Sequence, residues 1–320
     1  MISYCSNRQP EMDLAGQIYN CPNCWQLQQR VKFLIDAYLA VDKLCDRLED
    51  LPNQFAHPQP RAWKSIEWQT IHQNQIIGIN LEVFLAIAIG AVDTEAPIRD
   101  YTQTSRQYLA KLHPQLARFV GGTVEDGNLI ELGLWEKEER QHTPALMKIY
   151  FQLTGKKITP NLRHVRDYRP SQNPWQDLYR HGLHRIATEY GATCLYLWLM
   201  AHTTGTLQTV LEELLLDEIN HMTKFWGFGV WAYPDSSLKK VGTTLIRTIN
   251  LRSIYSPSHS SLIGTLSRMT EVLQWNTWTL TNKATFAYTA IYILNCMRAW
   301  TENLTPEYLH NLFGESLFPA

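Results

Sequence analysis

The sequence predicts an all-α fold built around a four-helix bundle with one long crossover connection. Three observations predict it: apolar residues recur at three- and four-residue spacing over long segments, strand signals are weak throughout, and the motif Glu-x-x-His occurs twice, on separate expected helices. No fixed-period repeat or low-complexity tract divides the 320 residues, so we expect a single domain. Its parts are an N-terminal helical extension (1–70), the bundle (71–230) and C-terminal packing helices (231–320).

The first half of the chain divides at its prolines. Apolar spacing predicts a helix over about 25–48, which three prolines follow, and a second helical region from about 72 toward 112. The most apolar part of that region, 75–92, contains Glu82, whose charge would cost about 2.5–3.5 kcal/mol near a bilayer centre. A buried helix is therefore the better interpretation, and we expect no membrane span. A short helix near 114–119 completes this half.

The second half holds three of the expected bundle segments. A helix over about 128–153 ends at Gly155, a typical C-terminal stop, and the prolines and basic residues of 156–174 indicate an extended crossover. Two further helices, over about 175–202 and 206–225, are joined by a short turn. Amphipathic segments then predict packing helices over about 237–250, 259–274, 282–302 and 306–313.

The two Glu-x-x-His motifs carry the candidate chemistry. Glu139 and His142 belong to the third helix, and Glu218 and His221 belong to the fifth. Residues three apart lie one turn above each other on the same helix face, so each pair can bind one metal. A single match is weak, but two matches, each directly preceded by a further acid, favour a metal site over a chance pairing.

Four-helix sites that hold two irons or manganeses need these motifs and one Glu from each of two further helices. Glu189 is the one carboxylate in a long apolar segment, where an unpaired charge is costly. Glu95 follows another apolar run and is the best fourth Glu, with Glu82 and Asp93 as weaker rivals. Glu189 and Glu218 lie 13 and 12 residues from the two ends of the turn between their helices, so they reach the same height.

The remaining histidines have simpler interpretations. His181 and His184 share a helix with Glu189 but lack neighbouring acids, so we assign them to the outer surroundings of the site or to the surface. His202 is assigned to the turn. A structural interpretation of the motifs, as surface pairs or satisfied polar groups of the core, remains the alternative to metal binding.

At these residues the sequence resembles the soluble acyl-acyl-carrier-protein desaturases of the ferritin-like superfamily, which are diiron carboxylate proteins. TEAPIRDY (94–101) is similar to the family's first-ligand segment, EERQHTPALMKIYFQLTG (138–155) to its EENRH segment, and DEINH (217–221) to its DEKRH segment. The similarity spans about 75–230 and is concentrated at these motifs. It implies that the expected bundle is ferritin-like, a class that also uses one long crossover.

The resemblance implies two irons, or a pair that includes manganese, and oxygen as co-substrate. Glu138 and Asp217 would accept hydrogen bonds from the histidine N–H groups across the bundle and so fix the rings. The desaturases place a threonine three residues after the position of Glu189, where this chain has Ala192 and then Thr193, so oxygen handling is expected to differ. The implied ligands are Glu95, Glu139, His142, Glu189, Glu218 and His221, with Glu139 and Glu218 as bridges.

The implied activity is oxygen-dependent oxidation of a C–H bond of a carrier-bound acyl chain, with electrons from a ferredoxin-like donor. An apolar channel would align the chain, although core packing explains the same side chains: Trp135, Leu146, Ala192, Thr193, Leu214 and Phe225. An acidic acyl carrier protein would need a basic patch, for which a solvated crossover is the alternative: Lys156, Lys157, Arg163, Arg166 and Arg169.

Composition limits the partners. With 29 basic and 30 acidic residues the chain lacks the broad positive charge of a nucleic-acid binder, so none is expected. Six sparse cysteines indicate reduced thiols, and the lone pair Cys21 and Cys24 is a weak signal for zinc or redox chemistry. The N-terminus shows no secretory signal, so we expect a cytoplasmic protein, and a homodimer is compatible with the sequence.

Three alternatives to a desaturase remain open. The same scaffold could hydroxylate, halogenate or N-oxidise a small or carrier-bound metabolite. It could oxidise ferrous iron for storage, although about 70 residues before the bundle and about 90 after it exceed what storage requires. The last alternative is a metal-free helical interaction protein.

Overall fold

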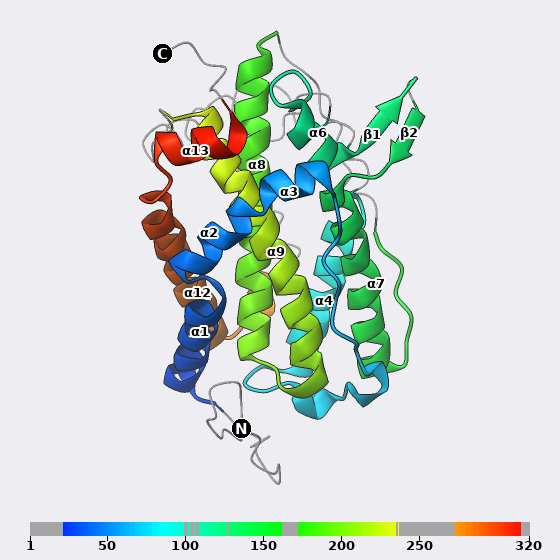
Figure 1. Cartoon of the computed structure of the whole chain (residues 1–320). Helices are drawn as coiled ribbons and strands as arrows, with labels where there is room; N and C mark the ends of the chain where they lie inside the picture. The colour runs from blue at the N-terminus through cyan, green and yellow to red at the C-terminus, as the bar shows by residue number, and fades with distance from the viewer. Residues whose placement is uncertain are drawn as a thin grey trace.

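The computed structural model describes residues 22–98, 102, 106, 109–126, 128–161, 172–234, 236 and 273–314. This part of the chain is mostly helical, which confirms the all-α prediction (Figure 1). Its strands are confined to one antiparallel hairpin, β1 (Thr123–Glu125) and β2 (Asn128–Glu131). No helix of the described ranges combines the length and the apolarity that a membrane crossing requires.

Four helices surround the predicted site: α4 (Leu81–Glu95), α7 (Leu134–Thr154), α8 (Pro174–Ala201) and α9 (Gly205–Ala232). Figure 1 shows α4 beside α7 and α8 beside α9, and the two pairs meet where α7 contacts α9. Local signals set the ends of these helices. Asn173 caps α8 by accepting the Gln176 N–H, and Gly155 ends α7 at φ +70°, a conformation that favours glycine.

The α8–α9 hairpin turns within three residues, 202–204. The Ile77 N–H donates to the His202 carbonyl and the Thr204 N–H donates to the Gln75 carbonyl, so the turn is tied to the chain before α4. Gly205 has φ +57°, and a Cβ there would lie 2.7 Å from Nε2 of Gln75. The short, tied turn makes α8 and α9 antiparallel neighbours, and the two helices pack against each other.

The N-terminal extension packs on α8 and α9, on the side away from α4 and α7. It contains α1 (Cys24–Tyr38), α2 (Val41–Glu49) and α3 (Leu51–Ala56), and α1 packs with α12 (Leu280–Thr301) against α8. Two short 3₁₀ turns, η1 (Trp68–Thr70) and η2 (Gln73–Gln75), lead into α4. A third 3₁₀ turn, η4 (Trp275–Thr277), precedes α12. The last described helix, α13 (Pro306–Phe313), packs on α9. Figure 1 therefore shows three layers of paired helices: α1 with α12, α8 with α9, and α4 with α7.

Between α3 and η1 the chain runs without helix over residues 57–67, a segment we call the strap. The strap crosses from the N-terminal helices to the side of α7 and α9 (Figure 1). It brings residues of the extension next to the predicted metal site.

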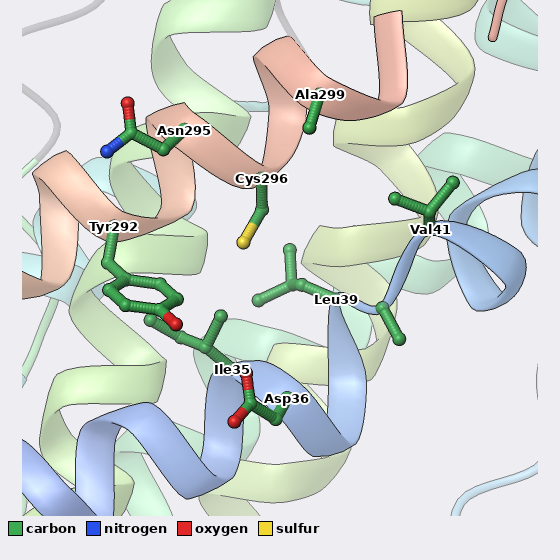
Figure 2. Close-up of a pocket in the computed structure, with 9 residues that line it drawn as sticks. Ile35, Asp36, Leu39, Val41, Tyr292, Asn295, Cys296 and Ala299 are labelled. Atoms are coloured by element: carbon green, nitrogen blue, oxygen red, sulfur yellow. The ribbon is translucent and has the colours of Figure 1, made fainter.

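A groove of about 420 Å³ opens where the chain turns between α1 and α2, beside α12. Figure 2 shows Leu39, Cys296 and Tyr292 converging on it, and it contains none of the predicted ligands. Its lining residues are Ile35, Asp36, Leu39, Ala40, Val41, Tyr292, Asn295, Cys296 and Ala299.

Several predicted boundaries were wrong. The single helix expected over 25–48 is broken at residues 39–40, because the turn there buries Leu39 and directs α2 onto α9. The helical region expected over 72–112 begins only with α4 at residue 81. Beyond α4 the described residues 98, 102, 106 and 109 are also helical, and the rest of 99–108 lies outside the described residues. The helix expected over 206–225 continues to Ala232.

The helix expected over 128–153 begins only at Leu134, because residues 128–131 form β2. Leu129 and Ile130 on this strand are 47% and 60% exposed, so the hairpin has no buried face whose alternation could reveal it. The short helix near 114–119 is confirmed as α6 (Pro114–Gly121), and 282–302 and 306–313 as α12 and α13. The helices predicted over 237–250 and 259–274 fall almost entirely outside the described residues.

Candidate metal centre

Six buried side chains from four helices meet in the interior of the protein. Glu95 is the last residue of α4, and Glu189 lies in the middle of α8. The two motif pairs come from α7 and α9, which contact each other. All six are at most 9% exposed: Glu95, Glu139, His142, Glu189, Glu218 and His221.

These side chains form two overlapping groups. Within each group, one ligand atom of every residue lies within 4.8 Å of the others. Glu139 and Glu218 belong to both groups, so their carboxylates lie between two neighbouring positions. The first group is Glu95, Glu139, His142 and Glu218, and the second is Glu139, Glu189, Glu218 and His221.

The distances around the histidines define the two positions. Nδ1 of His142 lies 3.2 Å from Oε2 of Glu139, 3.2 Å from Oε1 of Glu218 and 3.8 Å from Oε2 of Glu95. Nδ1 of His221 lies 3.0 Å from Oε1 of Glu139 and 3.6 Å from Oε2 of Glu189. The two oxygens of Glu139 therefore face different histidines, as a bridging carboxylate requires.

The inner nitrogens of the two histidines lie close to carboxylate oxygens but make no hydrogen bond with them. Among the described residues, four buried atoms of the cluster have no hydrogen-bond partner: Oε2 of Glu139, Nδ1 of His142, Oε1 of Glu218 and Nδ1 of His221. A buried polar atom without a partner costs about 1–3 kcal/mol. Because the atoms converge on common points and carry lone pairs, the residues fit a pair of cations. Carboxylate and imidazole donors suit iron and manganese.

The outer nitrogens of the two rings are held by carboxylates from the opposite helix. Nε2 of His142 on α7 lies 3.4 Å from Oδ2 of Asp217 on α9, and Nε2 of His221 on α9 lies 2.9 Å from Oε2 of Glu138 on α7. The outer N–H of each ring thus points to an acceptor, which leaves Nδ1 for a metal. The resemblance implied these two acceptors, and the structure brings each of them beside the ring that it was expected to orient.

The electrostatics of the cluster show an excess of buried negative charge. Burial and the charge of Glu139 raise the pKa of Glu95 to about 7, and the same two causes raise the pKa of Glu218 well above its ordinary value. Burial lowers the pKa of His142, but Glu139 and Asp217 outweigh it and the pKa is raised. The negative charge of the buried carboxylates favours protonation of the cluster, and the same charge would favour the binding of metal cations.

The strap contributes a cation that the sequence interpretation missed. Arg61 donates from Nε to Oδ1 of Asp217 at 2.7 Å and from a terminal nitrogen to the Glu213 carboxylate. Its main-chain N–H donates to Glu138 at 2.9 Å, and Trp63 Nε1 donates to Oδ2 of Asp217 at 2.8 Å. Glu213 and Asp217 lie four residues apart on a buried face of α9, so a cation is expected beside them. The local sequence does not indicate which arginine provides it.

Tyr196 was also missed. Its hydroxyl donates to Oε1 of Glu95 at 2.9 Å, and the side chain is 1% exposed. Tyr196 lies seven residues after Glu189 on α8, two turns along the same face, and this spacing was an available signal.

The rival ligands lie elsewhere. Glu82 is exposed in the first turn of α4, and Asp93 accepts the Asn161 N–H at 2.7 Å. His181 and His184 are half-buried on α8 and belong to neither group. His202 caps α8 and its Nδ1 donates to the Ile77 carbonyl, which confirms its place in the turn.

The channel candidates are buried or half-buried near the site. The Trp135 ring makes T-shaped contacts with His221, with centroids 6.3 Å apart, and with Phe225, with centroids 5.9 Å apart. Leu146 and Leu214 lie in the core, Ala192 is half-buried and Thr193 is fully buried. Their role as a channel stays a prediction.

The predicted docking residues are described only in part. Lys156 and Lys157 are exposed directly after α7. Arg163, Arg166 and Arg169 lie outside the described residues. Of the cysteine pair, Cys24 is half-buried at the start of α1, and Cys21 lies outside the described residues.

A comparison of the chain with protein-family models, with curated proteins and with solved structures finds no match.

Proposed function

We propose that the chain is an oxygen-dependent diiron oxidase on a ferritin-like bundle, similar to the acyl-acyl-carrier-protein desaturases. One observation carries the proposal: Glu139 and Glu218 are shared by two buried histidine-containing groups whose inner atoms lack hydrogen bonds. A satisfied polar core would pair those atoms with one another. Two metal positions with shared carboxylates account for both the sharing and the missing bonds.

The protein's part in the reaction follows from its own residues. Glu95 and His142 would hold one metal, Glu189 and His221 the other, and the shared carboxylates would fix the spacing between them. A reduced pair of irons supplies the electrons that activate oxygen for removal of hydrogen from a C–H bond. Asp217 and Glu138 keep the histidine rings oriented, and the surrounding apolar helices exclude water.

The substrate side is inferred from the aromatic residues beside His221. Trp135 and Phe225 form an aromatic wall at that metal position, which suits an alkyl chain, and the guanidinium of the buried Arg185 lies over the Trp135 ring at 4.1 Å from its centroid. An acyl chain delivered by an acyl carrier protein fits this wall, with electrons from a ferredoxin-like donor.

An oxygenase is the second candidate, and Thr193 favours it. Its hydroxyl is fully buried and has no hydrogen-bond partner among the described residues. Thr193 follows Glu189 by four residues, so it lies on the same face of α8, whereas the desaturases carry their threonine three residues on. A shifted hydroxyl beside the oxygen site would favour hydroxylation, halogenation or N-oxidation over desaturation.

Product analysis separates the two candidates. The protein is loaded with ferrous iron under anaerobic conditions, reduced, and exposed to oxygen with a saturated acyl-carrier substrate. Mass spectrometry of the acyl chain should show the loss of two hydrogens. Addition of one oxygen or of a halogen without an alkene would assign the oxygenase, and an unchanged chain with full oxygen consumption would remove acyl chains as substrates.

A further inference from the structure

We propose that Arg61 is a positioning residue that holds Asp217 and, through Asp217, the metal position of His142 alone. The inference rests on the proposed function, because it assumes two metal positions. It goes beyond that function by making a side chain of the strap, which lies outside the four-helix bundle, part of one position and not of the other.

The Arg61 guanidinium is fixed at both ends. Nε donates to Oδ1 of Asp217 at 2.7 Å, and Nη2 donates to the Glu213 carbonyl at 2.6 Å while Nη1 pairs with the Glu213 carboxylate. Both acids are fully buried, whereas the Arg61 side chain is 24% exposed. A planar fork bound in this way sets the position of Asp217 more firmly than an exposed ion pair would.

Asp217 transmits this position to one histidine. Its Oδ2 accepts from Trp63 Nε1 at 2.8 Å and lies 3.4 Å from Nε2 of His142. The ring is thus oriented by a carboxylate that is itself held by two side chains of the strap. Such outer partners typically change metal affinity by about 10–100-fold when they are removed.

The other histidine is held differently. His221 Nε2 donates to Oε2 of Glu138 at 2.9 Å, and Oε1 of Glu138 accepts the main-chain N–H of Arg61 at 2.9 Å. Every substitution of Arg61 except proline keeps that N–H. Deletion of the Arg61 side chain should therefore release the holder of His142 and leave the holder of His221 in place.

A purely electrostatic role for Arg61 predicts the opposite outcome. The guanidinium is a positive charge close to two metal positions, so its deletion would strengthen cation binding at both positions if charge alone mattered. If Arg61 instead acts by positioning Asp217, deletion of its side chain should weaken cation binding at one position only.

The test is a metal titration of the full-length chain. Metal-free wild type, Arg61→Ala and Lys64→Ala are titrated anaerobically with ferrous iron alone, and the affinity of each binding step is measured. Lys64 is the matched control, because it lies on the same strap, is 58% exposed and pairs with Glu212 and not with the histidine holders. We expect two steps in wild type and in Lys64→Ala, and one of the two weakened about 10–100-fold in Arg61→Ala.

A double-mutant cycle assigns the weakened step. Adding Arg61→Ala to His142→Ala should change the remaining binding step by less than about twofold, whereas adding it to His221→Ala should weaken the remaining step about 10–100-fold. After oxidation, Arg61→Ala at one iron per chain should give the electron paramagnetic resonance signal of isolated high-spin ferric iron. If Arg61→Ala fails to fold, Trp63→Phe removes one N–H to Asp217, keeps an aromatic ring, and should weaken the same step by a smaller factor.

Equal weakening of both steps, stronger binding at both, or no change in Arg61→Ala would overturn the inference while leaving the proposed function standing. Absence of metal binding by wild type would instead overturn the proposed function, and this inference with it.

Discussion

Two regions of the protein bury histidines in opposite ways. At the centre of the bundle, His142 and His221 are surrounded by carboxylates, and their Nδ1 atoms have no hydrogen-bond partner among the described residues. At the end of the molecule near α13, Nδ1 of His113 accepts the Leu116 N–H at 3.1 Å, and Nε2 donates to the Phe313 carbonyl at 3.1 Å. One region leaves nitrogens for a ligand, and the other leaves none.

The surroundings explain why burial has opposite consequences. The rings of Phe55, Phe228, Trp231 and Phe313 enclose His113 at centroid distances of 5.3–6.2 Å, and burial lowers the pKa of its imidazole. In the bundle, burial also lowers the pKa, but neighbouring carboxylates outweigh it and raise the pKa of both histidines. A buried histidine is therefore a candidate metal ligand when acids surround it and its inner nitrogen makes no hydrogen bond.

The largest expected effect is the loss of metal from ligand variants. Glu218 belongs to both groups, so Glu218→Ala should bind neither iron, and His142→Ala should lose one of the two. Oxygen consumption by the reduced protein should vanish in both variants, because each leaves a pair incomplete. Metal analysis and oxygen uptake measure this, with Glu82→Ala, an exposed acid on α4, as the control. Undiminished oxygen uptake by either ligand variant would count against the site.

The second effect is on stability in the other region. His113→Ala leaves the Leu116 N–H and the Phe313 carbonyl without partners, which should lower the free energy of unfolding by about 1–3 kcal/mol. Its iron content should equal that of wild type. Urea unfolding measures the loss, and His310→Ala, exposed on α13, is the control. Loss of iron from His113→Ala would contradict the distinction between the histidines of the bundle, which are expected to bind metal, and His113, which is not.

The pH dependence of stability gives a third, smaller effect. Because the pKa of His113 in the folded protein is lowered, the unfolded chain binds a proton first as the pH falls through the ordinary histidine value of about 6.5. The contribution of His113 is therefore present above that pH and lost below it, with a slope of at most about 1.4 kcal/mol per pH unit. Unfolding at pH 7.5 and 5.5 should show a smaller decrease in His113→Asn than in wild type, and identical decreases would contradict the assignment.

The smallest effect concerns the hydroxyl that reaches the bundle site. Tyr196→Phe removes the hydrogen bond to Glu95, which is worth about 0.5–1.5 kcal/mol, so binding at one metal position should change by up to about tenfold while two irons still bind. Tyr190→Phe is the control on the same helix, because its hydroxyl donates to the Ala290 carbonyl instead. A change of equal size in the control would show that the effect is not specific to Glu95.

Sequence periodicity located the candidate site because its members repeat along helices. The motif spacing placed two pairs on helix faces, and the lengths of α8 and α9 around their short turn brought Glu189 level with Glu218. Glu95 was favoured over Glu82 because it ends an apolar run, and the exposure of Glu82 agrees. Local spacing was sufficient wherever one helix determined which residues share a face.

Other features depend on contacts that no local pattern records. Arg61 lies 152 residues before Glu213, within a strap that has no helical or strand period. The β1–β2 hairpin is mostly exposed, so it carries no apolar alternation. The break at residues 39–40 buries Leu39, whose apolar side chain continues the helical pattern across it. In each case tertiary contacts decide the structure.

The most direct measurement of the central claim is the metal content of the wild-type chain after anaerobic purification and loading with ferrous iron. Two irons per chain are predicted, with magnetic coupling after oxidation because Glu139 and Glu218 join the two positions. A chain that retains no metal would contradict the account, since the inner atoms of His142 and His221 would then have no ligand to bind.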